Sequence, residues 1–170
     1  MGFRWLGALL IIVSCTACGF SIAAGKRKEE HLLWQLLHTL QFMESELRYR
    51  LTPVPDLCNL AAGENKGHLG TIFSKLSHEM NQQKLPDAGS CMAAVLGNAA
   101  EIPASVRRIL SQLGYTLGRF DLEGQLAGLQ ATGKRCEASL ERIRKNRDEQ
   151  IRCYQTLGIC AGLALAIILV

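Results

Sequence analysis

The stretch LEGQLAGLQATGKRCEASLERIRK, residues 122–145, decides the fold of this chain. Its apolar and small residues recur at alternating steps of four and three positions, which is a heptad pattern that forms one stripe along a helix. The stripe comprises Leu122, Leu126, Leu129, Gly133, Cys136, Leu140 and Ile143. Such a stripe must pack along another helix. No proline follows it, so we predict one long helix that continues to the C-terminal end.

Helical spacing also dominates upstream, and no segment alternates with period two for long enough to predict a strand. A first helix carries Leu33, Leu36, Leu40, Met43 and Leu47 and must stop at Thr52–Pro55, where two prolines occur. Shorter helices are expected over residues 55–63, 68–83 and 87–100, and a fifth from Pro103 to about Gly118. Asp121 is placed to cap the sixth. The predicted fold class is therefore all-α, a six-helix bundle.

Both ends of the chain are apolar and uncharged. Residues 5–25 and 153–170 contain no Asp, Glu, Lys, Arg or His, and Arg4 is the one charged residue outside 26–152. A membrane-spanning helix needs about 20 apolar residues. We therefore expect a transmembrane helix at 5–25, a helical bundle domain at 26–152 and a second transmembrane helix at 153–170.

The basic residues predict the orientation of these spans. Lys26, Arg27 and Lys28 follow the first span, and five further arginines and lysines between Arg142 and Arg152 precede the second. The positive-inside rule then places the domain in the cytoplasm and both termini outside. An alternative is a lipoprotein cleavage box ending at Cys15, which would make the chain exported and lipid-anchored. The apolar run continues well past Cys15, and a basic cluster follows it, which favours the span.

Composition argues against several classes of function. Among the seven cysteines, Cys58, Cys91, Cys136 and Cys153 are scattered without metal-ligand spacing, and Cys15, Cys18 and Cys160 lie inside the apolar runs. This pattern favours reduced cysteines that pack as small apolar residues. The 19 basic and 15 acidic residues nearly balance, so no nucleic-acid surface is expected.

No motif predicts catalysis, a cofactor or a metal. Residues 128–134 match the GxxxxGK start of a phosphate-binding loop, but Arg135 stands where Ser or Thr must hold magnesium, and no strand precedes it. The four histidines are too far apart in helical phase to form a ligand set. Gly114 and Gly118 are expected to let a neighbouring helix approach the fifth helix closely.

Two segments carry a family resemblance: ELRYRLTPVPD at residues 46–56 and LGYTLGRFDLEGQ at 113–125. They resemble the corresponding segments of the stage III sporulation protein AB family, with Val54 in place of the usual Leu and Asp56 in place of Glu. The chain's length, its apolar ends and the order of the motifs match that family too.

This resemblance implies a role in endospore formation. Proteins of the family are similar in their soluble domain to the cytoplasmic domain of type II secretion platform proteins. They sit in the mother-cell membrane around the forespore, within a transenvelope complex. The chain would then be a non-enzymatic platform or adaptor. Its partners would be the lipid bilayer, a cytoplasmic secretion-type ATPase and other components of the complex, while self-association stays open.

The motif residues divide into two groups. Thr52, Pro53, Pro55, Gly118 and Asp121 have roles as turn and cap residues, whereas three others are candidates for partner binding. These candidates are Tyr49, Arg119 and Gln125. A competing function is a lipoprotein or membrane-anchored sensor whose bundle binds a small ligand, which requires an exported domain.

Overall fold

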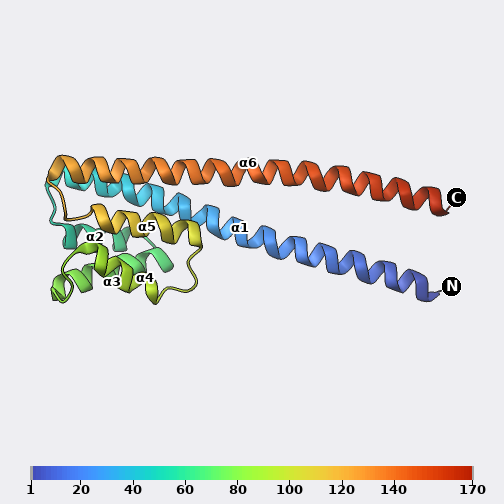
Figure 1. Cartoon of the computed structure of the whole chain (residues 1–170), viewed down its shortest axis with the longest axis horizontal. Coiled ribbons are helices and arrows are strands. Elements are labelled where there is room, and N and C mark those ends of the chain that lie inside the picture. The colour runs from blue at the N-terminus through green and yellow to red at the C-terminus, as the bar shows by residue number, and fades with distance from the viewer. Residues whose placement is uncertain (1, 170) are drawn as a thin grey trace.

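A computed structural model describes the backbone of residues 2–169 and the side chains of residues 26–146. It contains six α-helices, and the described backbone has no strand. The helices are α1 (Gly2–Arg50), α2 (Val54–Glu64), α3 (His68–Gln82), α4 (Ala88–Gly97), α5 (Ala104–Thr116) and α6 (Leu122–Leu169). The prediction of an all-α fold with six helices is confirmed (Figure 1).

Helices α1 and α6 are the two long helices of the bundle and form an antiparallel pair. Their register is fixed near one end by Glu30 and Arg144, whose Oε1 and Nε atoms lie 3.4 Å apart. Near the other end the Gln130 Nε2 atom donates a 2.7 Å hydrogen bond to Glu44. The unbroken long helix predicted from the heptad pattern is confirmed. Its stripe faces the core except at Leu122, the first residue of α6, which is 38% exposed.

Helix α1 is longer than the sequence indicated. The sequence predicts an N-terminal apolar segment and a first bundle helix as separate elements. The structure joins them into one helix over Gly2–Arg50. Hydropathy changes sharply at Lys26, yet nothing there breaks a helix. The helix ends as predicted before Pro53, because Leu51 adopts a left-handed conformation with φ 53° and Pro53 disfavours helix for the residue before it.

The four short helices pack on one side of the α1–α6 pair (Figure 1). Their starts follow the predicted signals. Pro53 and Pro103 directly precede α2 and α5, and the Asp87 side chain caps α4 by accepting a 2.7 Å hydrogen bond from the Ser90 N–H. Asp121 caps α6 in the same way, accepting from the Gly124 N–H at 3.0 Å. The prediction that Asp121 caps the sixth helix is confirmed.

The glycine pair of the fifth helix has two distinct roles. A Cβ atom at Gly114 would lie 2.6 Å from the Met92 Cβ atom, so Gly114 lets α4 and α5 cross closely, as expected. Gly118 lies beyond the end of α5 with φ 70°. It is therefore a turn residue, which agrees with its expected role in ending the helix but not with a place in a packed helix pair.

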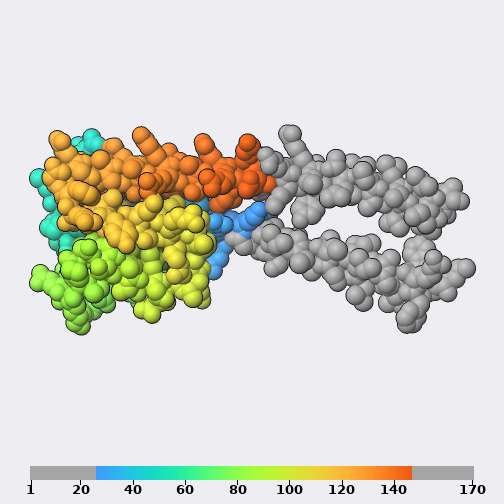
Figure 2. All heavy atoms as spheres, viewed as in Figure 1, coloured from blue at the N-terminus to red at the C-terminus, as the bar shows by residue number. Residues whose placement is uncertain are grey.

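Membrane-spanning character can be judged for the central part of the chain. Within residues 26–146, whose side chains the structure describes, no helix combines the length and apolar character needed to cross a bilayer. The expected spans at 5–25 and 153–170 lie outside these residues, so they stay predictions. Figure 2 colours the bundle formed by the residues in between.

Candidate functional site

Four large exposed apolar side chains lie at the end of the bundle farthest from the chain termini. Both termini lie at one end of the molecule, and at the opposite end α1 stops and α6 begins (Figure 1). There Tyr49 is 81% exposed, Leu51 65%, Phe120 53% and Leu122 38%. We call these four residues, together with Arg119, the distal face. Exposed apolar clusters on small soluble domains mark interaction sites.

The α1–α2 turn presents the first part of this face. Leu51 is held in the left-handed region, where a side chain with a Cβ atom costs roughly 1–2 kcal/mol. With 65% of its surface exposed, the Leu51 side chain gains little from burial to offset this cost. Leu51 is therefore a candidate for contact with a partner.

The α5–α6 turn presents the second part. Leu117 is buried, and Gly118 then reverses the chain with a positive φ angle, so that the next two residues project outward. The turn is closed from α6, because the Gln125 Nε2 atom donates a 2.8 Å hydrogen bond to the Phe120 carbonyl. Arg119 and Phe120 are thus exposed on a turn with a fixed backbone.

A groove lies beside Arg119. It has a volume of about 680 Å³ and a mixed polar and apolar lining from the end of α3, the α3–α4 loop, the start of α4 and the α5–α6 turn. Its lining includes Met80, Leu85, Pro86, Ala88 and Leu117. Within residues 26–146, the Arg119 guanidinium makes no ion pair. The site can therefore accept an apolar segment flanked by an acidic group.

The same groove contains one carboxylate. Hydrogen bonds from Ser90 hold the pKa of Asp87 below its usual value, and the positive charge of Arg119 acts weakly in the same direction. Because the Asp87 carboxylate is already used as the cap of α4, it leaves Arg119 available to an incoming anion.

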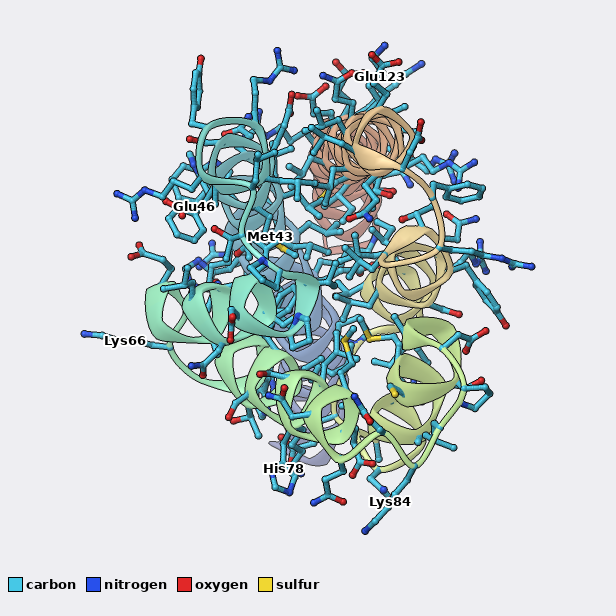
Figure 3. The ribbon with its side chains drawn as sticks, turned by 90° about the vertical axis from the view of Figure 1, so that its left-hand side faces the viewer. Met43, Glu46, Lys66, His78, Lys84 and Glu123 are labelled. Carbon is cyan, nitrogen blue, oxygen red and sulfur yellow. The ribbon has the colours of Figure 1, made fainter. Side chains whose placement is uncertain are left out.

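The structure brings the three predicted partner-binding residues to this one end. Tyr49 and Arg119 are exposed, whereas Gln125 is half-buried with its amide nitrogen bound inside the turn. Figure 3 looks onto this end, with Glu123 of α6 and Lys84 of the α3–α4 loop at opposite edges. Contact with a partner stays a prediction for all three.

Sequence reasoning missed Leu51, Phe120 and Leu122. Leu122 belongs to the predicted apolar stripe, and Leu51 and Phe120 carry no assigned role in the sequence analysis, because exposure at a helix end depends on which neighbours cover the residue. A usable signal was present at Phe120, since an aromatic residue between Gly118 and Asp121 must lie in a turn.

Three further features of the described residues are a possible metal-ligand set, the cysteines and residues 128–134. No group of three His, Cys, Asp or Glu side chains in this part of the chain could hold a metal ion. The thiols of Cys58, Cys91 and Cys136 are buried and unpaired. Burial raises the pKa of Cys58 to about 12 and that of Cys136 to about 11, so both stay protonated and unreactive. Residues 128–134 lie within α6, and therefore form no phosphate-binding loop.

Comparisons with known proteins give a consistent result. The family model described as stage III sporulation protein AB matches residues 4–170. Stage III sporulation protein AB of Bacillus subtilis (strain 168) is 26% identical over 168 residues, which cover 98% of each chain. A solved structure of stage III sporulation protein AB (SpoIIIAB) superposes with a TM-score of 0.63 at 22% identity, covering 72% of this chain and 98% of that one, and supports the fold. The chain therefore belongs to the stage III sporulation protein AB family.

Proposed function

We propose that this protein is a non-enzymatic membrane platform of a sporulation transenvelope complex, and that its distal face docks a cytoplasmic secretion-type ATPase. Membership of the stage III sporulation protein AB family supports a role as a component of a sporulation complex. The two ends of the bundle present different surfaces, and this difference supports the docking role. One end exposes apolar side chains beside Arg119, which makes no ion pair within residues 26–146, and the other continues into the two apolar ends of the chain.

The geometry suits an adaptor. Residues 5–25 and 153–170 would cross the mother-cell membrane around the forespore, and the basic residues that flank them favour a cytoplasmic bundle. At about 1.5 Å per helical residue, the α1 segment from Lys26 to Arg50 holds the distal face about 36 Å from the start of the span. A partner there can exert force on the membrane segments through two continuous helices.

The nature of the distal face suggests how the ATPase would bind. Phe120 and Tyr49 supply large apolar area at low entropic cost, as aromatic residues do at the centres of interfaces. Arg119 supplies a charge that an acidic residue beside an apolar anchor would pair with. Electrostatic complementarity of this kind mainly selects the partner and speeds its association.

A binding measurement with purified proteins tests the docking proposal. The full chain in detergent, immobilised on a biosensor, should bind a purified secretion-type ATPase from the same organism. The double substitution Arg119→Glu and Phe120→Ala should weaken this binding at least about tenfold, which corresponds to about 1.4 kcal/mol.

The matched control changes an arginine and an aromatic residue elsewhere. Arg108 and Trp34 are exposed on α5 and α1, eleven residues before Arg119 and 15 residues before Tyr49, so the double substitution Arg108→Glu and Trp34→Ala should leave binding unchanged. Equal weakening by both pairs, or no effect of the distal pair, would rule out the distal face as the docking surface.

The competing function is an exported lipoprotein or sensor with a bundle that binds a small ligand. An exported bundle could not meet a cytoplasmic ATPase. The side of the membrane on which the bundle lies therefore separates the two functions.

A further inference from the structure

Two clusters of basic residues meet at the end of the bundle opposite to the distal face. One cluster is on α1 at residues 26–28, and the other is on α6 at residues 142–145. Because α1 and α6 are antiparallel and Glu30 contacts Arg144 at 3.4 Å, residues 26–28 lie level with the stretch just after Arg144. Segments more than 100 residues apart in sequence therefore form one ring of positive charge.

Four residues of this ring point their charges to solvent. Arg27, Lys28, Arg142 and Lys145 are exposed and form no ion pair among the described residues. We call these four the basic collar. The two segments 26–30 and 141–145 together hold six basic and three acidic residues, so the ring carries a net positive charge.

Two of the three acidic residues are already bound within the bundle. Glu29 accepts a short hydrogen bond from the Ser105 hydroxyl of α5, and Glu30 pairs with Arg144. These contacts tie α1 to α5 and α6 at this level. Glu141 is the acidic residue that remains exposed beside the collar. The bundle thus uses its carboxylates here for internal contacts and leaves the collar's charges to an external anion.

Internal stability does not explain the collar. Long exposed basic side chains without partners contribute little to folding, and placing four of them on both sides of the Glu30–Arg144 contact raises their mutual repulsion. Clusters of four to eight Lys and Arg beside a membrane helix are the pattern that recognises anionic lipid headgroups.

We propose that the basic collar binds the headgroups of anionic phospholipids and clamps α1 and α6 at the membrane surface. This inference rests on the proposed membrane placement of residues 5–25 and 153–170. The clamp would fix the height and tilt of the bundle, and thereby the position of the distal face above the membrane.

The test uses the full chain purified in a non-ionic detergent, with thermal unfolding followed by circular dichroism. Added phosphatidylglycerol should raise the unfolding temperature by about 5 °C relative to added phosphatidylcholine, because a ligand that binds the folded state stabilises it. Substitution of the collar, R27Q, K28Q, R142Q and K145Q together, should remove most of this shift, and so should high salt.

A matched variant removes equal charge elsewhere. Lys66, Lys75, Lys84 and Lys134 are also exposed and form no ion pair among the described residues, so K66Q, K75Q, K84Q and K134Q together should keep the full phosphatidylglycerol shift. An equal loss in both variants, or no shift in the natural chain, would overturn the proposal. An equal shift with inorganic phosphate would show a site for free anions instead of a lipid surface, and would overturn it too.

Flotation with phosphatidylcholine vesicles separates this inference from the proposed function. A chain that floats but shows no preference for phosphatidylglycerol keeps its membrane placement and loses the collar. A chain that does not float loses both, while the binding measurement with the ATPase in detergent still judges the docking role independently.

Discussion

The two ends of the bundle present opposite surfaces and are built by opposite means. The distal face exposes aromatic and aliphatic side chains, and turns hold them in place: Leu51 and Gly118 have positive φ angles, and Asp121 caps α6. The basic collar exposes charge from the middle of two uninterrupted helices, whose register is set by side-chain contacts such as Glu30–Arg144.

Because of this difference, the two surfaces should respond differently to substitution. A surface carried by turns depends on a few backbone conformations and caps, so a single change there can displace it locally. A surface carried by long packed helices moves only when the packing of the whole bundle changes. Substitutions that separate these two responses test the comparison.

The largest effect is expected from Gly114→Ala, which should disturb both ends together. The added Cβ atom would lie 2.6 Å from the Met92 Cβ atom and 3.3 Å from the Ala88 carbonyl, so α4 and α5 must move apart. We expect a loss of about 2 kcal/mol in the free energy of unfolding, measured by urea denaturation.

Gly63→Ala is the control for that change. Gly63 is also helical, in α2, and its added Cβ atom would meet no atom within 4 Å. Alanine is the better helix former, so this variant should be as stable as the natural chain or more stable, by up to about 1 kcal/mol. A similar loss in both variants would contradict close packing of α4 on α5.

Removal of the α6 cap should affect the distal face alone. Asp121→Ala deletes the acceptor for the Gly124 N–H and should cost about 1 kcal/mol in the free energy of unfolding. Asp121→Asn keeps an acceptor and should cost much less. ATPase binding should weaken in the alanine variant while the phosphatidylglycerol shift stays unchanged; loss of the lipid response would show that the two ends are coupled.

Leu51→Gly should separate stability from binding. Glycine adopts the positive φ angle of this position without the Cβ penalty. After the entropy that glycine adds to the unfolded chain, a net stabilisation of about 0.5 kcal/mol is expected. Binding of the ATPase should nevertheless weaken, because an exposed apolar side chain is lost. A destabilised variant would mean that Leu51 contributes to the fold and not to the surface.

The smallest effect concerns pH at the groove beside Arg119. The folded-state pKa of Asp87 is lowered, chiefly by its hydrogen bonds with Ser90. The stabilisation that this cap gives the folded state is therefore fully present above the ordinary pKa of an aspartate, about 3.9. It is lost as the pH falls through the lower pKa that Asp87 has in the folded state. Asp87→Asn keeps a capping side chain that does not titrate, so its acid unfolding should be less steep below about pH 4. Identical acid titrations followed by circular dichroism would contradict this contribution.

Local signals in the sequence were enough to predict most of the fold. Pro55, Pro103 and Asp87 each mark a predicted helix start, and the heptad stripe of α6 requires a long partner helix. The continuity of α1 was missed because the change at Lys26 is one of hydropathy, and hydropathy does not end a helix.

The candidate site was harder to predict than the helices. Tyr49 and Arg119 could be named from their motifs, but their meeting at one end depends on how α5 returns along the bundle. The groove depends on how the α3–α4 loop lies against the α5–α6 turn, which are more than 30 residues apart. Contacts of this kind follow from the packing of the whole bundle and leave no periodic signal in the sequence.

In the proposed arrangement, the distal face meets a cytoplasmic partner and the opposite end of the bundle meets the membrane. Alkaline phosphatase fusions test it most directly, because this enzyme is active only when exported. A fusion after Val170 should be active, and a fusion after Ser90, which follows the first apolar segment alone, should be inactive. The reverse pattern would place the bundle outside the cytoplasm and contradict the account.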